Sequence, residues 1–367
     1  MTRALLTPLA ASLPSTVPFV GPETQERAQG FAFLARLGAN ESGFGPSPAA
    51  IAAMQNAAAE AWMYGDPENH DLKAALAAHH GCRPENIVVG EGIDGLLGYL
   101  CRLTIAAGDP VVTSLGGYPT FNFHVAGFGG TLHRAPYKAN HEDPEALLAL
   151  ATQTRAKLLY LANPDNPMGS HHPAETLESL IDALPECTLL VLDEAYIDFA
   201  PAGTAPRIAA DDPRVIRFRT FSKAHGLAGA RVGYAITAPE LADAFNKVRN
   251  HFGMGRIAQA GALAALQDQA YLAQTLARAA AARARLSAIA RDNGFDPLPS
   301  ATNFVTMDCG RGGDYARAVL AGLVARGIFV RMPGVAPHDR CIRVSLGDDA
   351  ALDAFAETLP QVIAALA

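Results

Sequence analysis

The stretch that decides both fold and chemistry in this chain is Thr220-Phe-Ser-Lys-Ala-His-Gly-Leu-Ala-Gly-Ala-Arg231. It carries one lysine, Lys223, close to two small hydroxyl residues, Thr220 and Ser222, and an arginine eight positions later. Residues 215–219 before it alternate in character as a strand does, whereas residues 224–228 are too small and glycine-interrupted for a long helix. Lys223 is therefore expected where a strand gives way to a tight turn.

An amine at such a turn, partly desolvated and near cations, loses its proton more easily and can attack a carbonyl at neutral pH. That is the requirement for a Schiff base. Thr220, Ser222 and Arg231 are suitable donors for a phosphate, because the arginine fork can bind two oxygens. A lysine beside a phosphate site suggests pyridoxal phosphate. An ordinary surface turn explains residues 220–231 equally well, so evidence from the rest of the chain is needed to choose between the two interpretations.

Composition predicts a globular protein of two domains. The chain has 367 residues, of which 50% are hydrophobic and 18% charged, so a sizeable core is easily buried. The net charge of −7, without any basic run, argues against a nucleic-acid partner or an anionic membrane surface. No run reaches 18 apolar residues, so no membrane span is expected.

Cysteine and histidine usage favours a cytoplasmic protein without a metal site. The five cysteines are widely spaced and form no Cys-x-x-Cys pair, as is typical of reduced core thiols. Residues 1–22 are only weakly apolar and are broken by prolines, so a signal peptide is not expected. The adjacent pairs His79-His80 and His171-His172 have no suitably spaced partner, which argues against zinc.

Alternating elements predict an α/β fold with a mostly parallel, helix-covered sheet. A helix is expected from Ser47, with Pro48 at its first position, to about Trp62, and a second from Glu68 to His80. Strands are expected at residues 86–89, 110–114, 130–135, 157–161, 188–192, 215–218 and 232–236. From residue 239 to about 293 the chain reads as helical, including a long helix from Tyr271.

A smaller α+β C-terminal domain is expected beyond this helical stretch. Its strands are expected at residues 303–307, 328–331 and 341–345, and its helices at 314–325 and 348–367. The predicted division is a mobile N-terminal arm at 1–35, a large domain at 36–260 and a small domain at 261–367. Residues 36–60 are also compatible with the small domain.

Polar residues follow several of the expected strands. Ligands of parallel sheets bind beyond the carboxyl ends of the strands, where residues 92–94, 163–167, 193–196 and Lys223 are all expected. Gly92, Ile93 and Asp94 open a helix after a glycine turn and can hold a phosphate with backbone N–H groups. Such glycine turns also cap helices without any ligand.

Asp193 ends the apolar run 189–192, where an unpaired charge would be costly. A protonated pyridine nitrogen would be a suitable partner, and a carboxylate there keeps the ring an effective electron sink. Asn166 and Tyr196 are then candidates to bind the ring hydroxyl. Phe121, expected on a strand-to-helix loop, is a candidate to stack on the ring, although ordinary core packing explains it as well.

Two arginines in the C-terminal domain are candidates for binding substrate. Arg343 lies in the strand 341–345, where Ile342 and Val344 point to the opposite face. An arginine that projects toward the cleft suits a bidentate contact with a carboxylate or phosphate. Arg331, in the strand 328–331, is a weaker candidate of the same kind.

Together these residues resemble a known family, the fold-type I, pyridoxal-phosphate-dependent class I/II aminotransferases, and most of all the histidinol-phosphate aminotransferase group. The resemblance spans roughly residues 36 to 347. It rests on five ordered motifs: Asn-Pro-Asp-Asn-Pro-Met-Gly at 163–169, Asp-Glu-Ala-Tyr at 193–196, Thr-Phe-Ser-Lys at 220–223, Gly-Leu-Ala-Gly-Ala-Arg at 226–231 and Cys-Ile-Arg-Val-Ser-Leu-Gly at 341–347.

The resemblance implies a role for each matched position. Lys223 would be the Schiff-base lysine and proton shuttle, Asp193 the pyridinium partner, and Phe121 the stacking residue. Arg343 would bind the substrate carboxylate or its equivalent. The ring-hydroxyl ligands would be Asn166 and Tyr196, and the phosphate ligands Gly92, Ile93, Asp94, Thr220, Ser222 and Arg231. Tyr64 matches a tyrosine that reaches the cofactor phosphate of the neighbouring subunit, which implies a homodimer with shared active sites.

Departures from the family pattern concentrate in the substrate-facing loop. The family's Asn-Glu-Asn-Pro-Tyr-Gly appears as Asn40-Glu41-Ser42-Gly43-Phe44-Gly45, which makes Asn40 and Phe44 candidate substrate contacts and removes a tyrosine hydroxyl. Gly65 follows Tyr64 where proline is usual, and Met168 replaces the usual threonine. The cofactor residues are intact, so a donor other than histidinol phosphate is compatible with the sequence.

The sequence therefore predicts a transaminase that moves an amino group between an L-amino acid or histidinol-phosphate-like donor and a 2-oxo acid. The same electron sink also serves decarboxylation or racemisation, which are the alternatives of the same chemistry. A non-catalytic binding protein of this fold would be expected to have lost Lys223 or Asp193, and both are present.

Overall fold

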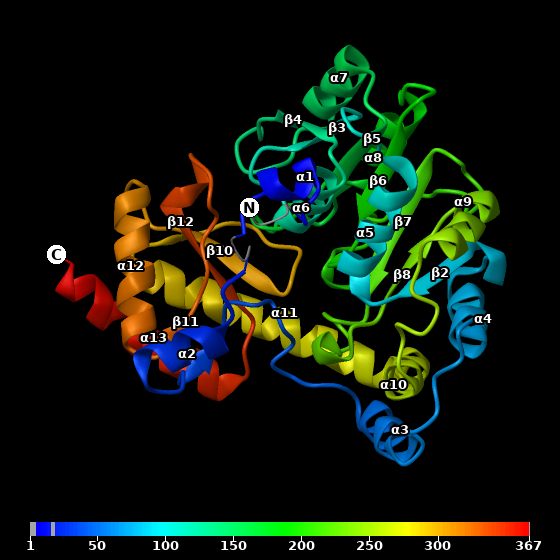
Figure 1. The fold of residues 1–367 in the computed structure, drawn as a ribbon. Helices are drawn as coiled ribbons and strands as arrows, with labels where there is room; N and C mark the ends of the chain where they lie inside the picture. Colours follow the sequence, from blue (N-terminus) through cyan, green and yellow to red (C-terminus); the bar gives the residue numbers. More distant parts are fainter. Residues whose placement is uncertain (1–4, 16–18, 367) are drawn as a thin grey trace.

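A seven-stranded sheet forms the centre of the larger part of the molecule (Figure 1). The computed structural model describes residues 5–15 and 19–366. Among these, β8 alone runs against its neighbours in this sheet, so the sheet is mostly parallel. The strands in spatial order are β2 (Ile87–Gly90), β8 (Gly233–Ile236), β7 (Val215–Thr220), β6 (Leu189–Asp193), β5 (Leu158–Ala162), β3 (Pro110–Ser114) and β4 (Thr131–Ala135).

The middle strands are apolar on both faces because helices cover both sides of the sheet. Every residue of β5 is buried. On one face, strand residues such as Tyr160 pack with α5 (Gly92–Thr104) and α6 (Pro119–Gly127). On the other face, strand residues such as Leu159 pack with α7 (Pro144–Thr154) and α8 (Ala174–Asp182). This alternation confirms the α/β fold expected from the sequence.

Helices at the β2 edge form a third cluster. It contains α3 (Pro48–Ala58), α4 (His70–His80) and α10 (Arg256–Gln267). The short helix α9 (Pro239–Ala244) packs instead, through Ala242, with the cluster that contains α5. Ser47 caps α3 by accepting from the N–H of Ala50 at 3.1 Å, as its sequence signal predicts. The helix ends at Ala58, however, and not near Trp62, whose side chain is 82% exposed.

The C-terminal part of the chain joins two small sheets to three helices. One sheet has the order β12 (Cys341–Ser345), β10 (Phe304–Asp308) and β9 (Asp296–Pro297). The helices are α11 (Gln269–Asp292), α12 (Gly313–Ala325) and α13 (Asp349–Ala365). Figure 1 shows α11 running from α10 to these elements. The expected strand at 328–331 is shorter, because β11 covers only Ile328–Phe329.

The N-terminal segment returns to this C-terminal part. β1 (Ala35–Arg36) pairs in parallel with β11, and Leu37 belongs to the same apolar cluster as the C-terminal helices. Ahead of it lie α1 (Pro8–Ser12) and α2 (Pro22–Gln29), the second of which is held by ion pairs from Arg36 to Glu23 and Glu26. The arm that the sequence suggested to be mobile is thus anchored between residues 19 and 36.

A buried ion cluster ties two central strands together. The Glu194 side chain has no exposed surface, and its carboxylate accepts from Arg217 at 2.9 and 3.1 Å and from Arg219 at 2.8 Å. Burial alone would raise the pKa of Glu194, but the charges of Arg219 and Arg217 outweigh it, so the pKa lies below its usual value. Glu194 follows Asp193 directly, so this cluster fixes the end of β6.

Removing the charge of Glu194 is expected to destabilise the fold. In Glu194→Gln the two half-buried guanidinium groups lose their counter-ion, which typically costs about 3–5 kcal/mol. Urea unfolding followed by circular dichroism measures the loss. The matched control is Glu145→Gln, which removes an exposed carboxylate 3.8 Å from Lys138 and is expected to leave the unfolding midpoint unchanged. Equal midpoints for the two variants would contradict a structural role for the cluster.

Candidate active site

A large cavity lies at the carboxyl edge of the central sheet, where the large and C-terminal parts of the chain meet. Its volume is about 770 Å³. Strands β3, β5, β6 and β7 all end at this edge, because they run in parallel. The sequence-predicted residues that line the cavity are Asn40, Ile93, Asp94, Asn166, Asp193, Tyr196, Thr220, Ser222, Lys223, Arg231, Arg331 and Arg343.

Lys223 lies in the turn after β7, as expected. Its Nζ donates to the backbone oxygen of Asn40 at 2.9 Å. Burial, together with the smaller effect of the positive charge of Arg343, lowers the pKa of Lys223 to about 8. A substantial fraction of the amine is therefore neutral near physiological pH, which is the form that attacks a carbonyl.

The turn after Lys223 is packed tightly against the loop that contains Asn40. Gly226 has φ +69°, and a Cβ there would lie 2.4 Å from the backbone oxygen of Gly45. Only glycine accommodates both this backbone conformation and this approach. The glycine therefore lets the lysine turn and the 40–45 loop touch, which brings Asn40 within reach of Lys223.

Asp193 is the buried acid of the cavity. Its carboxylate is 5% exposed and accepts from the Tyr160 hydroxyl at 2.6 Å and from the N–H of Ala195 at 2.9 Å. Burial raises its pKa to about 6, while these two hydrogen bonds act in the opposite direction. Because both of these hydrogen-bond donors are uncharged, the carboxylate is suited to bind a ligand that carries a positive charge.

An anion-binding end lies beside the start of α5. Gly92 has φ +76°, and a Cβ there would lie 2.4 Å from Nη2 of Arg231, so the missing side chain makes room for the guanidinium. Nη1 of Arg231 donates to the Ser222 hydroxyl at 3.4 Å and to the Ala228 oxygen at 3.1 Å. The Thr220 hydroxyl accepts from the N–H of Ser222 at 3.0 Å. A helix N-terminus, hydroxyls and an arginine together suit a phosphate.

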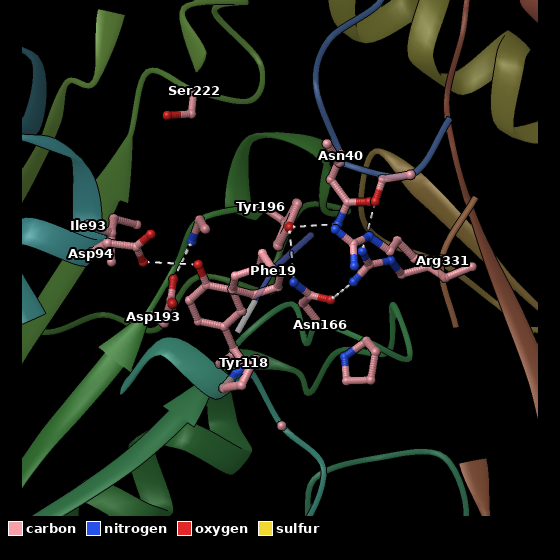
Figure 2. A pocket seen from close by; sticks show the side chains of 18 of the residues that line it. Phe19, Asn40, Ile93, Asp94, Tyr118, Asn166, Asp193, Tyr196, Ser222 and Arg331 are labelled. Atoms are coloured by element: carbon pink, nitrogen blue, oxygen red, sulfur yellow. Dashed lines mark hydrogen bonds between the residues drawn. The ribbon is translucent and has the colours of Figure 1, made fainter. Parts of the chain in front are cut away.

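A polar network spans the middle of the cavity. The Tyr196 hydroxyl accepts from the side-chain amides of Asn40 at 3.0 Å and of Asn166 at 3.4 Å. Figure 2 shows Tyr196 between these two asparagines on one side and Asp193 with Asp94 on the other. The two side-chain amides and the Tyr196 hydroxyl lie close together and are suited to bind an oxygen substituent on a ring.

Two arginines line the far end of the cavity. Arg331 and Arg343 pair through their backbones in an isolated antiparallel bridge, so their side chains come from adjacent positions. Arg343 donates to the side-chain oxygen of Asn166 and to the Gly38 oxygen, whereas Arg331 donates to the Val20 oxygen at 2.6 Å. Burial lowers the pKa of both, and for Arg343 the neighbouring charge of Arg331 adds to this. The pair provides a strongly anion-attracting end.

Four sequence-predicted residues lie outside the cavity wall: Gly92, described above beside Arg231, and three aromatic residues. Phe121 belongs to α6, not to a loop, and is fully buried, with its ring stacked on Tyr160 at 4.6 Å. Phe44 packs under Arg278, whose guanidinium carbon lies 4.4 Å from the ring centre. Tyr64 is 76% exposed and contacts Phe252 at 4.7 Å between ring centres.

Several wall residues were not singled out from the sequence. Tyr118, at the start of α6, lines the cavity and donates to Asp94 at 2.9 Å. Tyr118 could have been considered from the sequence, because it directly precedes Pro119 and lies only three residues before Phe121, the aromatic residue that was chosen for stacking. Phe19 stacks on Tyr118 at 6.3 Å and closes the outer side of the cavity. Tyr160 is internal to an apolar strand, so the sequence carries no sign of its contact with Asp193.

The chemistry of this donor set fits pyridoxal phosphate. An amine of lowered pKa, a buried carboxylate without a cationic partner and a phosphate-binding helix start line one cavity. Among the residues described, no group of three or more histidine, cysteine or acidic side chains could hold a metal ion. In the same residues, no helix combines the length and apolarity needed to cross a membrane.

Comparisons with known proteins agree with this chemistry. Residues 34–359 match the family model of aminotransferase class I and II. The chain is 36% identical to histidinol-phosphate aminotransferase 1 of Mesorhizobium japonicum, over 90% of each chain, and 36% identical to a histidinol-phosphate aminotransferase of an Anaeromyxobacter species, over 94% of each. A crystal structure of histidinol-phosphate aminotransferase from Sinorhizobium meliloti, in complex with pyridoxal 5'-phosphate, is 57% identical, with a TM-score of 0.97 over 100% of this chain and 99% of that one.

Site chemistry, fold and full-length similarity therefore agree that this chain belongs to the class I and II aminotransferases and is a pyridoxal-phosphate-dependent enzyme.

Proposed function

We propose that this aminotransferase takes its amino group from a donor of the histidinol-phosphate type and passes it to a 2-oxo acid. The observation that carries the proposal is the pairing of Arg331 with Arg343 at the far end of the cavity that contains Lys223. Two adjacent guanidinium groups match a dianionic phosphate better than a single carboxylate. The names of the two curated relatives and of the Sinorhizobium meliloti structure support the same donor.

We assign the residues of the cavity as follows. Lys223 holds the cofactor covalently and moves the proton that leaves the donor's Cα, since its Nζ is buried and its pKa lowered. Asp193 pairs with the ring nitrogen, and Asn166 with Tyr196 binds the ring oxygen. The phosphate end is formed by Gly92, Ile93, Asp94, Thr220, Ser222 and Arg231. Pyridoxal phosphate, when bound, supplies the electron sink that makes the Cα proton removable.

Tyr118 replaces Phe121 in our assignment of the aromatic wall. Tyr118 lines the cavity, whereas Phe121 lies in the core behind it. The bond from Tyr118 to Asp94 orients the ring, and both residues lie beside the start of α5. The buried Phe121 then supports Tyr160, which in turn holds Asp193.

A homodimer with shared active sites is the assembly we propose, in the cytoplasm. Tyr64 and Trp62 are exposed large aromatics two positions apart in the chain, at 76% and 82% exposure. Arg256 fixes the Tyr64 backbone by donating to its oxygen at 3.0 Å, so the ring is held outward. An exposed aromatic group on an ordered backbone is typical of a protein interface.

Attachment of the cofactor is expected to follow the titration of Lys223. When pyridoxal phosphate is added to the apoprotein and trapped with borohydride, the attachment rate should rise with pH and level off above about 8, because only the neutral amine reacts. At pH 7 about one amine in ten is then neutral, against about one in three thousand for an unperturbed lysine. Mass spectrometry measures the trapped fraction.

Two variants sharpen this experiment. Lys223→Ala should trap nothing in the cavity. Arg343→Met removes the positive charge that helps to lower the pKa, so the midpoint should move upward, whereas Arg278→Met, on the exposed side of α11, should leave it in place. A wild-type midpoint near 10 would contradict the proposed environment of Lys223.

Donor preference is expected to depend on Arg331. A purified protein loaded with cofactor should absorb in the visible range and bleach when an amino donor is added, fastest with histidinol phosphate in a screen that includes aromatic and acidic amino acids. Arg331→Met should raise KM for histidinol phosphate by roughly 10- to 100-fold, since a charge-assisted contact to phosphate is lost. Arg278→Met is the matched control.

The screen also separates the alternatives. Bleaching by an aromatic or acidic amino acid but not by histidinol phosphate would contradict the proposed donor, while transamination itself would stand. Release of carbon dioxide from the donor would instead identify a decarboxylase. An Arg331→Met protein with an unchanged KM for histidinol phosphate would remove this arginine from the phosphate site.

Shared active sites can be tested by mixing two defective variants. Lys223→Ala and Tyr64→Ala homodimers each lack one residue at both sites. In a heterodimer, one site combines intact Lys223 of one chain with intact Tyr64 of the other, so a random mixture should recover about a quarter of wild-type activity. Gel filtration and activity after subunit exchange measure this. Heterodimers that form without any recovery would show that Tyr64 does not act across the interface.

A further inference from the structure

Three parts of the chain about 150 to 300 residues apart meet at the side chain of Asn40. Asn40 follows β1, Tyr196 follows β6, and Ser345 ends β12. All three are buried, with 2%, 5% and 3% of their surface exposed. Asn40 and Tyr196 line the cavity, whereas Ser345 lies behind Asn40 and touches no cavity space. Ser345 therefore acts on the site, if at all, through Asn40.

Ser345 and Asn40 form a reciprocal pair of hydrogen bonds. The N–H of Asn40 donates to Oγ of Ser345 at 2.9 Å, and Oγ donates to Oδ1 of Asn40 at 3.0 Å. The backbone of this loop is also fixed, because the Asn40 oxygen accepts from Lys223 and from Asn303, each at 2.9 Å. Because these contacts hold its backbone, the conformational variable that remains at Asn40 is the orientation of its side-chain amide.

The hydroxyl of Ser345 selects one of the two amide orientations. A serine hydroxyl has a single hydrogen, and here Oδ1 accepts it. Rotating the amide by 180° would turn Nδ2 toward Ser345 and leave that buried hydrogen without an acceptor, which is unfavourable. The orientation that satisfies Ser345 turns Nδ2 toward Tyr196, to whose hydroxyl oxygen it donates at 3.0 Å.

This orientation determines which way the hydrogen bond at Tyr196 runs. Its oxygen accepts N–H groups from Asn40 and from Asn166, whose own amide is oriented because Oδ1 accepts from Arg343. The phenol's hydrogen is then not needed by either asparagine and is available to an acceptor in the cavity. In the opposite orientation, Tyr196 would donate to Oδ1 of Asn40 and lose that ability.

We propose that Ser345 is a positioning residue that, by locking the amide of Asn40, directs the Tyr196 hydroxyl hydrogen into the cavity toward the ring oxygen of the cofactor. The inference rests on the assignment of Tyr196 as a ring-oxygen ligand under the proposed function. It adds that Ser345 determines the direction of the hydrogen bond between Tyr196 and the ring oxygen. Ser345 lies more than 140 positions from Tyr196 in the sequence and does not line the cavity.

The pH midpoint of the visible absorbance of the loaded protein tests this inference. The midpoint reports how tightly a proton is held between the lysine nitrogen and the ring oxygen. A hydrogen bond donated to that oxygen weakens its hold on the proton, so Ser345→Ala should raise the midpoint, by roughly 0.4 to 1 pH unit for one hydrogen bond. Ser345→Thr, which keeps a hydroxyl, should restore the wild-type midpoint.

The Tyr196→Phe background separates positioning from a merely structural role. If Ser345 acts through the hydroxyl of Tyr196, Ser345→Ala should shift the midpoint in the wild type but add nothing when Tyr196 is already Phe. Thr188→Val is the matched control. It removes a buried hydroxyl that donates to the Ala156 oxygen at 2.6 Å, at the opposite end of β6, and should leave the midpoint unchanged.

Each outcome decides the inference. An unchanged midpoint in Ser345→Ala overturns it, and so does an equal shift in the Tyr196→Phe background. Should Ser345→Ala fail to fold, Ser345→Cys keeps the size and a weak S–H donor, and it should give a smaller shift that again vanishes in Tyr196→Phe. Failure of the proposed function looks different, because the wild-type protein itself would then show no visible band or no bleaching by amino donors.

Discussion

The burial of Asp193 at the end of β6 is the constraint on which the site depends. A carboxylate with 5% exposure is costly unless its surroundings hold it, and here a tyrosine hydroxyl at 2.6 Å and one backbone N–H do so without cancelling its charge. The adjacent Glu194 differs, because Arg217 and Arg219 neutralise the charge of its carboxylate on the other face of the sheet. Successive residues of one strand point to opposite faces. One acid therefore stabilises the fold, while the other keeps its negative charge for a ligand.

The sheet could be predicted well because its signals are local. Runs such as 110–114 and 215–218 are rich in β-branched residues and bounded by turns, and the structure has strands at Pro110–Ser114 and Val215–Thr220. Helix ends were less predictable. Residues 59–62 continue the helical composition of α3, but no core covers them, and Trp62 is left exposed. The contacts between Arg36 and α2 could not be read from the sequence either, since they are tertiary.

Within the site, the residues that follow strands were predictable, including Tyr196, whereas the aromatic residue near the start of α6 was not. Lys223, Asp193 and Arg231 follow strands or turns, so their place at the sheet edge follows from topology. Whether Tyr118 or Phe121 faces the cavity depends on the rotation of α6, and three residues along a helix bring a side chain to a neighbouring position on nearly the same face. Ser345 belongs to the 341–347 motif but was not singled out, because the role proposed for it depends on the direction of a hydrogen bond that only the structure shows.

The contact between Gly226 and the backbone of Gly45 limits how this enzyme can be remodelled. The two loops touch where the lysine turn crosses the 40–45 loop, and no side chain fits between them. Gly229, only three residues further on, has open space where a Cβ would be. Efforts to evolve a new donor preference would therefore find little tolerance at the crossing and much more at the outer rim, where Phe19 and Arg331 form the wall. The chemistry and the choice of donor are in this way separable parts of one cavity, and only the second is open to redesign.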